Sequence, residues 1–365
     1  MSLFDRDDSE RRLPVSLITG FLGSGKTTLL NRLLRDKAMA DSVVIVNEFG
    51  EVGLDHLLME RVDGETVLMA SGCLCCTIRS DLEQTLRELD WKRREGAVPP
   101  FARVLVETTG LADPAPILQL LLNHPFVGAS YRLDAVVATV DVLHAMRQLD
   151  EHAESVKQVA LADRLVLTKS DLAKSDLAKS DPAESDPAGV AAGLEARLGA
   201  LNPAAPLHRA VNGEIAADRL FGAALYDPAR RAPDARAWLQ AEAYASAEAH
   251  EHHHVEHQHE HDVNRHDARI AAFCLVEDQP IDWDRFHRWL GQLRAERGQD
   301  LLRVKGILNL AGEAEPVAIH GVHHVFHPPV QLSQWPDDDR RSRVVFITRD
   351  LPGAQIAESW RNAQG

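Results

Sequence analysis

Cysteine is scarce in this sequence, with four among 365 residues, and no apolar run reaches the about 18 residues that a membrane-spanning helix needs. Residues 1–16 carry charges where a signal peptide would have its apolar core, so we expect a cytoplasmic protein that does not associate with membranes. Lys and Arg total 40 against 55 Asp and Glu, and no dense basic cluster occurs. This charge balance argues against nucleic acid as a partner and favours small molecules and other proteins.

The length favours one large domain and a smaller one, because single cores usually stop growing near about 250 to 300 residues. Apolar runs begin at residue 15 and recur between helix-like stretches, which predicts an α/β domain whose mostly parallel sheet is covered on both faces. Later apolar runs around one helix-like segment predict a compact α+β domain. The predicted division is a tail at 1–12, the α/β domain at 13–227 with a duplicated loop at 170–187, a His-rich linker at 228–268, the α+β domain at 269–352 and a tail at 353–365.

The segment GFLGSGKT, residues 20–27, fits the phosphate-binding pattern G-x-x-x-x-G-K-[ST] between an apolar strand and a helix. Glycines let the backbone wrap phosphates, while amide N–H groups and the helix N-terminus supply positive potential. We expect Lys26 to reach the β- and γ-phosphate oxygens and the Thr27 hydroxyl to bind Mg²⁺. The predicted phosphate-binding residues are Gly20, Gly23, Ser24, Gly25, Lys26, Thr27 and Thr28.

A second nucleotide element is TKSD, residues 168–171, which directly follows an apolar run and resembles the guanine-reading N/T-K-x-D element of GTPases. Asp171 would accept the guanine N1 and N2 hydrogens, which adenine does not offer, and the stem of Lys169 would lie over the base. Thr168 stands where Asn is commoner, and a simple Lys-Ser-Asp turn is the alternative. Later Ser-Asp copies at 175, 180 and 185 lack a strand before them, so we read them as a duplicated loop.

Two further segments have the character of GTPase switches. ETTG, residues 107–110, ends another apolar strand, so Glu107 would hold the Mg²⁺ shell through water and the Gly110 amide would sense the γ-phosphate. NEFGEVGLD, residues 47–55, follows the second strand, where a solvated acidic turn is the alternative. The candidate catalytic residues are Lys26, Glu48 and Glu107, with Glu48 a guess for positioning the attacking water.

Three of the four cysteines, Cys73, Cys75 and Cys76, lie in the short segment SGCLCC. A disulfide is disfavoured in a reducing compartment and between adjacent residues. A nucleophilic cysteine needs a base, and no histidine is close in sequence. Thiolates in a C-x-C-C cluster suit Zn²⁺, with Co²⁺ also suitable, and buried inert thiols are the remaining alternative. We expect Cys274 to be a core residue.

The order of these motifs resembles that of the CobW-type metallochaperone GTPases: GFLGSGKTTLLNRLL, NEFGEVGLD, SGCLCC, ETTGLADP and TKSD. The C-terminal region resembles the C-terminal domain of that family more weakly, through RVKGIL and VVFI. The resemblance implies a three-layer P-loop GTPase domain, and a GTPase that loads a metal, commonly zinc, into a client protein. It implies that Cys73, Cys75 and Cys76 match the C-x-C-C metal motif, residues 20–28 the phosphate loop and Glu107 the E-[ST]-T-G element.

Eight of the eighteen histidines lie between His250 and His266, interleaved with acidic residues. Neutral imidazoles bind divalent transition metals, so this segment is either a metal-gathering tether or an incidental polar linker. Four histidines between 320 and 327 offer too little geometry for a site, and we expect a structural role for them. The candidate linker ligands are His250, His252, His253, His254, His257, His259 and His261.

The sequence therefore predicts a GTP-hydrolysing metallochaperone that uses Mg²⁺ with GTP and carries a transition metal, most simply zinc. Three alternatives stay open: a maturation factor for a cobalt or iron enzyme or for cobalamin synthesis, a metal-storage protein in which GTP only stabilises the fold, and an ATP-using kinase with structural zinc. The expected partners are GTP, a transition-metal ion, a client metalloprotein and a second copy of the chain.

Overall fold

The structure is a computed structural model that describes residues 4–6, 11–47, 67–71, 78–171, 187–222 and 269–364. The predictions for Glu48, for the cysteines of residues 73–76, for the duplicated loop beyond Asp171 and for the linker histidines lie outside the described residues. The chain divides into two compact units, of which one comprises Arg11–Arg197 and Pro206–Ala223. No helix within the described residues is both long enough and apolar enough to cross a membrane.

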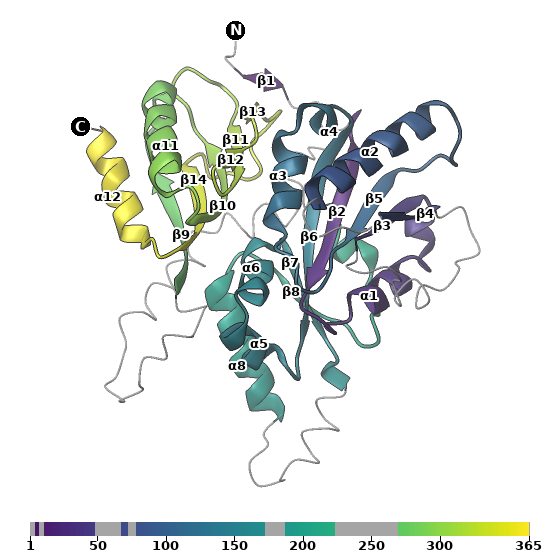
Figure 1. Cartoon of the computed structure of the whole chain (residues 1–365). Helices are drawn as coiled ribbons and strands as arrows, with labels where there is room; N and C mark the ends of the chain where they lie inside the picture. Colours follow the sequence, from purple (N-terminus) through teal and green to yellow (C-terminus); the bar gives the residue numbers. More distant parts are fainter. Residues whose placement is uncertain are drawn as a thin grey trace. The chain divides into compact units, whose positions relative to one another are not determined.

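The first unit is built on a seven-stranded sheet in the order β4-β3-β5-β2-β6-β7-β8 (Figure 1). Neighbouring strands all run parallel, so their carboxyl ends lie at one edge of the sheet. The strands are nearly continuous Val, Leu and Ile runs because both faces are covered. Their bounds are β2 (Leu13–Gly20), β3 (Ser42–Asn47), β4 (Val67–Ser71), β5 (Arg103–Glu107), β6 (Tyr131–Asp141), β7 (Arg164–Thr168) and β8 (Leu207–Arg209).

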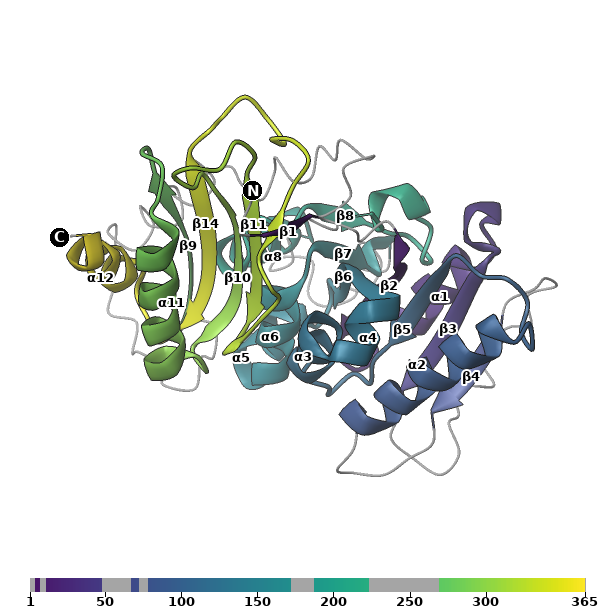
Figure 2. The ribbon, with the colours of Figure 1, turned by 90° about the horizontal axis from the view of Figure 1, so that it is seen from above.

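Helices cover both faces of this sheet. On one face, Leu29, Leu30 and Leu33 of α1 recur at helical spacing and join a buried cluster with Ile18 and Val166 of the strands. On the other face, α2, α3 and α4 pack against one another, and α3 and α4 contact β6 (Figure 2). The helices are α1 (Lys26–Leu33), α2 (Ile78–Arg94), α3 (Ala115–Asn123), α4 (Pro125–Ser130), α5 (Ala145–Glu151), α6 (Ala153–Leu161) and α8 (Pro187–Leu201), with 3₁₀ turns at Lys37–Met39 and Ala217–Arg219.

The C-terminal unit contains a second seven-stranded sheet in the order β1-β13-β11-β10-β14-β9, with β12 paired to β11. Its strands pair antiparallel except for β1 with β13. Helix α11 (Trp283–Arg297) packs Phe286 and Trp289 into one aromatic core with Phe346 of β14. The strands are β1 (Asp5–Arg6), β9 (Ile270–Glu277), β10 (Leu301–Leu308), β11 (Val317–Val322), β12 (Val325–Phe326), β13 (Val330–Gln331) and β14 (Ser342–Arg349). The predicted α/β domain with a smaller C-terminal α+β domain is confirmed.

The expectation of a tail at 353–365 is wrong, because helix α12 occupies Gly353–Gln364. Ile356 and Trp360 lie four residues apart, on one helical face, and both are buried in the core of the C-terminal unit. The indole of Trp360 also donates a hydrogen bond to Glu277 at 3.1 Å. The short apolar stripe of this helix is easily overlooked in a polar sequence.

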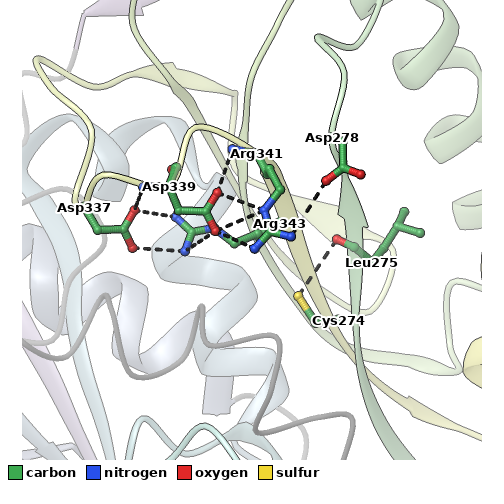
Figure 3. Close-up of polar contacts among 7 residues, drawn as sticks. All are labelled: Cys274, Leu275, Asp278, Asp337, Asp339, Arg341 and Arg343. Carbon is green, nitrogen blue, oxygen red and sulfur yellow. Dashed lines mark hydrogen bonds and ion pairs between the residues drawn. The ribbon is translucent and has the colours of Figure 1, made fainter.

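An ionic network joins the C-terminal end of the β13–β14 connection to the sheet (Figure 3). The Arg343 guanidinium, whose side chain is 5% exposed, donates to both Asp337 oxygens at 2.8 and 3.0 Å. Hydrogen bonds from Arg341 lower the pKa of Asp339 to about 2.

On β9, burial raises the pKa of the Cys274 thiol to about 12, so this cysteine is a protonated structural residue.

Candidate nucleotide site

The glycine-rich loop between β2 and α1 depends on backbone conformations that only glycine adopts easily. Gly20, Gly23 and Gly25 have φ values of 139°, 70° and 91°. A Cβ atom on Gly20 would lie 2.3 Å from the Thr139 hydroxyl, so the loop packs directly on the end of β6. The Ser24 hydroxyl is 2.6 Å from the same Thr139 oxygen. The loop is therefore fixed by its neighbours before any ligand contacts it.

Two residues at the start of α1 carry the chemistry of the loop. The Lys26 ammonium donates to the carbonyl oxygens of Gly20 and Phe21 at 2.9 and 3.1 Å, which holds it across the loop. The Thr27 hydroxyl donates to Oε1 of Glu107 at 2.7 Å, although the two residues are 80 positions apart. A hydroxyl beside a buried carboxylate supplies the hard oxygen ligands that Mg²⁺ prefers, so these residues fit that ion.

Gly110 lies directly against the phosphate loop. A Cβ atom at this position would stand 2.5 Å from the backbone nitrogen of Leu22 and 2.6 Å from its Cα. Only glycine allows this approach between the loop after β5 and the loop after β2. Any movement of Gly110 toward the phosphate loop would therefore displace residues around Leu22.

The predicted base-reading residues follow β7, at the same edge of the sheet. The Thr168 hydroxyl donates to the carbonyl oxygen of Ser24 at 2.7 Å, so threonine here ties the base side to the phosphate loop. Lys169 has a φ of 58° and donates to Asp141 at 2.8 Å. Asp171 is exposed at the end of the described segment.

Asp141, at the end of β6, is a buried carboxylate that sequence reasoning missed. Burial raises its pKa, but hydrogen bonds from Lys169, His144 and the Leu143 amide outweigh that effect and leave it below its ordinary 3.8. The carboxylate is therefore ionised at neutral pH. The signal was its place directly after the apolar run 134–140, beside β2 in a parallel sheet.

The loop after β8 was also missed, and it forms another wall near α1. A Cβ atom on Gly213 would lie 2.8 Å from the Thr28 carbonyl oxygen, and Arg32 donates to the Asn212 carbonyl oxygen at 3.2 Å. The signal was the Asn-Gly pair itself, which favours the positive φ values that both residues adopt. Loops after five neighbouring strands thus converge around the start of α1.

The structure brings together the predicted loop residues, Glu107, Gly110, Thr168 and Lys169. It does not describe Glu48 or the cysteine cluster, so those predictions stand as they were made. Among the residues that the structure describes, no three His, Cys, Asp or Glu side chains form a group able to hold a metal ion. Thr27 and Glu107 are the described residues that we identify as a place suited to Mg²⁺.

Strand β2, its glycine-rich loop and α1 define a P-loop nucleotide-binding domain. Comparison with protein families agrees: residues 14–192 match the CobW/HypB/UreG nucleotide-binding domain, and residues 270–364 match the cobalamin synthesis protein cobW C-terminal domain. The chain belongs to the CobW family of P-loop proteins, which confirms the resemblance found in the sequence.

Relatives span nearly the whole chain. The zinc chaperone YjiA of Escherichia coli is 31% identical and aligns over 94% of this chain and 96% of its own length. The zinc chaperone CobW of Pseudomonas aeruginosa is 32% identical, over 96% of this chain and 92% of its own. The crystal structure of Zn(II)-bound YjiA GTPase superposes with a TM-score of 0.67 at 27% identity, covering 97% of this chain and 99% of that one.

Proposed function

We propose that this protein is a GTPase that serves as a zinc metallochaperone. It binds GTP at the P-loop site, hydrolyses it to GDP and phosphate, and uses the change of nucleotide state to transfer zinc to a client protein. The observation that carries the nucleotide part is the Thr27–Glu107 hydrogen bond of 2.7 Å, which joins two separate motifs at one phosphate-side position. The names of the relatives, zinc chaperones and zinc-regulated GTPases, support the zinc part.

In the proposed site, each residue acts where the geometry holds it. Lys26 leaves the loop carbonyls to neutralise the β- and γ-phosphate oxygens, and backbone amides of the loop donate to the same groups. The Thr27 hydroxyl and, through water, Glu107 would hold Mg²⁺, which would neutralise charge developing on the phosphates. Lys169 and Asp171 select guanine over adenine. Glu48 remains our proposal for the residue that orients the attacking water.

Zinc is the cargo in this proposal, bound by Cys73, Cys75 and Cys76. These cysteines lie in sequence between the two proposed switch segments, residues 47–55 and 107–110. Only a difference in zinc affinity between the GTP and GDP states can drive directed release, because a ligand shifts an equilibrium only by its differential binding. The linker histidines would act as a second, faster-exchanging store, in a protein that we propose is cytoplasmic.

The nucleotide part is tested by phosphate release from GTP and from ATP, with wild type and two variants. Glu107→Gln should lower the turnover of GTP by at least about tenfold, because the Mg²⁺ site loses its anionic partner. Asp150→Asn alters an ion pair between Asp150 of α5 and Arg197 of α8, and this variant should leave turnover unchanged. Equal use of ATP and GTP by the wild type would favour the ATP-using alternative instead.

A further inference from the structure

Two adjacent residues of helix α6, Lys157 and Gln158, bind the loop that follows β5. Gln158 is 1% exposed, and its Nε2 donates to the carbonyl oxygens of Gly110 and Ala112, each at 3.1 Å. Lys157 forms an ion pair of 2.6 Å with Asp113 of the same loop. Both contacts connect segments more than 40 positions apart in sequence. They hold residues 110–113 in place against α6.

Backbone contacts anchor this loop, and its largest apolar side chain is not buried. Leu111 lies between the two carbonyls that Gln158 binds, and it is 52% exposed. On the other side, the Gly110 backbone packs against Leu22 of the phosphate loop. The Gly110 backbone is therefore held between Leu22, which packs against its Cα, and Gln158, which binds its carbonyl oxygen.

The contact also leaves hydrogen-bonding capacity unused. Within the described residues, Oε1 of Gln158 and the Thr109 hydroxyl are buried without hydrogen-bond partners. Buried polar atoms without partners are uncommon and usually have a reason. The Gly110 loop and Gln158 therefore retain hydrogen-bonding groups that the contacts among the described residues do not use.

We propose that Gln158 is a positioning residue: by holding the carbonyl oxygens of Gly110 and Ala112 it fixes the backbone on the C-terminal side of Gly110, which keeps the Gly110 N–H directed toward the γ-phosphate and favours the GTP-bound state over the GDP-bound state. The inference rests on the proposed GTP binding, because it needs the Gly110 N–H as a γ-phosphate donor. GDP lacks the γ-phosphate, so the affinity of the protein for GDP does not depend on the Gly110 N–H. Gln158 belongs to none of the nucleotide motifs recognised in the sequence.

The test measures the affinity of the full chain, with Mg²⁺, for fluorescent GDP and for a non-hydrolysable GTP analogue. Gln158→Met keeps the length of the side chain and removes both hydrogen bonds. We expect the affinity for the analogue to fall about tenfold, the effect of weakening one hydrogen bond to a charged group, with GDP affinity within about twofold of wild type. Lys157→Met is the matched control, since it releases the same loop beyond Gly110, and its ratio of the two affinities should not change.

Equal losses for both nucleotides, or the same change of ratio in Lys157→Met, would overturn the positioning role and leave a general anchor of the loop. If Gln158→Met does not bind GDP, the ratio is measured on Gln158→Asn, which keeps the donor but shortens the side chain. A selective loss for the analogue then supports the inference, and an equal loss contradicts it. A wild-type chain that binds neither guanine nucleotide would instead contradict the proposed function.

Discussion

Replacing Asp141 with asparagine removes the charge that holds Lys169 on the base side of the nucleotide site. The Asp141 carboxylate is 2% exposed, and the Lys169 side chain is 33% exposed. Breaking a fully buried pair costs about 3 to 5 kcal/mol, and an exposed pair is worth at most about 1 kcal/mol. The asparagine oxygen still accepts one hydrogen bond, so we expect a loss between these two limits and closer to the exposed one, about 1.5 kcal/mol.

We expect the lost Asp141–Lys169 interaction energy to appear as weaker nucleotide binding, because Lys169 no longer stays in place over the base. The affinity for guanine nucleotides should then fall about tenfold, since about 1.4 kcal/mol is a factor of ten. Calorimetric titration with GDP measures it, and Asp150→Asn is the control because its carboxylate bonds Arg197 at 2.7 Å. An Asp141→Asn affinity within about twofold of wild type would refute the role of Lys169 in base binding. An equal loss in Asp150→Asn would show that the effect is general destabilisation.

Three further predictions concern the loop and the C-terminal unit. Gly20→Ala should abolish nucleotide binding in a titration, because the new Cβ would meet the Thr139 hydroxyl at 2.3 Å and φ is 139°; retained binding would contradict the loop geometry. Asp339 has a folded pKa of about 2 against an ordinary 3.8, so its pairing with Arg341 stabilises the fold above about pH 4 and is lost as pH falls toward 2; acid unfolding of Asp339→Asn should show less pH dependence in that window. Cys274, with a pKa of about 12, should resist alkylation at pH 8 in the folded chain and react after unfolding, as peptide mass spectrometry would show.

Much of the nucleotide site could be predicted because its residues lie in short motifs at strand ends. The phosphate loop, Glu107 and Thr168 were found in this way, since parallel strands present their carboxyl ends at one edge. Gln158 was missed because it belongs to no local pattern, and Asp141 was missed because its place at a strand end does not by itself identify its partner. Their roles arise from long-range contacts, to Lys169 and to the loop around Gly110, that only the folded chain brings together.

The C-terminal unit shows the same limit for the fold. Short apolar runs predicted its strands, since runs of this length bounded by polar segments are typical of strands. Helix α12 was missed because its buried face consists mainly of Ile356 and Trp360 within a polar segment. The pairing of β1 with β13 joins positions more than 300 residues apart, and no periodicity of the sequence encodes such a partner.

The proposed coupling between nucleotide and metal is tested most directly by a Zn²⁺ competition titration, run with Mg²⁺ and GDP and again with Mg²⁺ and a non-hydrolysable GTP analogue. The titration uses a variant from which residues 250–266 are deleted, which removes zinc binding by the linker histidines. The same variant with Cys75→Ala and Cys76→Ala serves as the control. The account predicts a zinc site whose affinity differs between the two nucleotide states and that is lost in the double variant. Equal zinc affinity in both states would contradict nucleotide-driven transfer and leave a GTP-binding metal store.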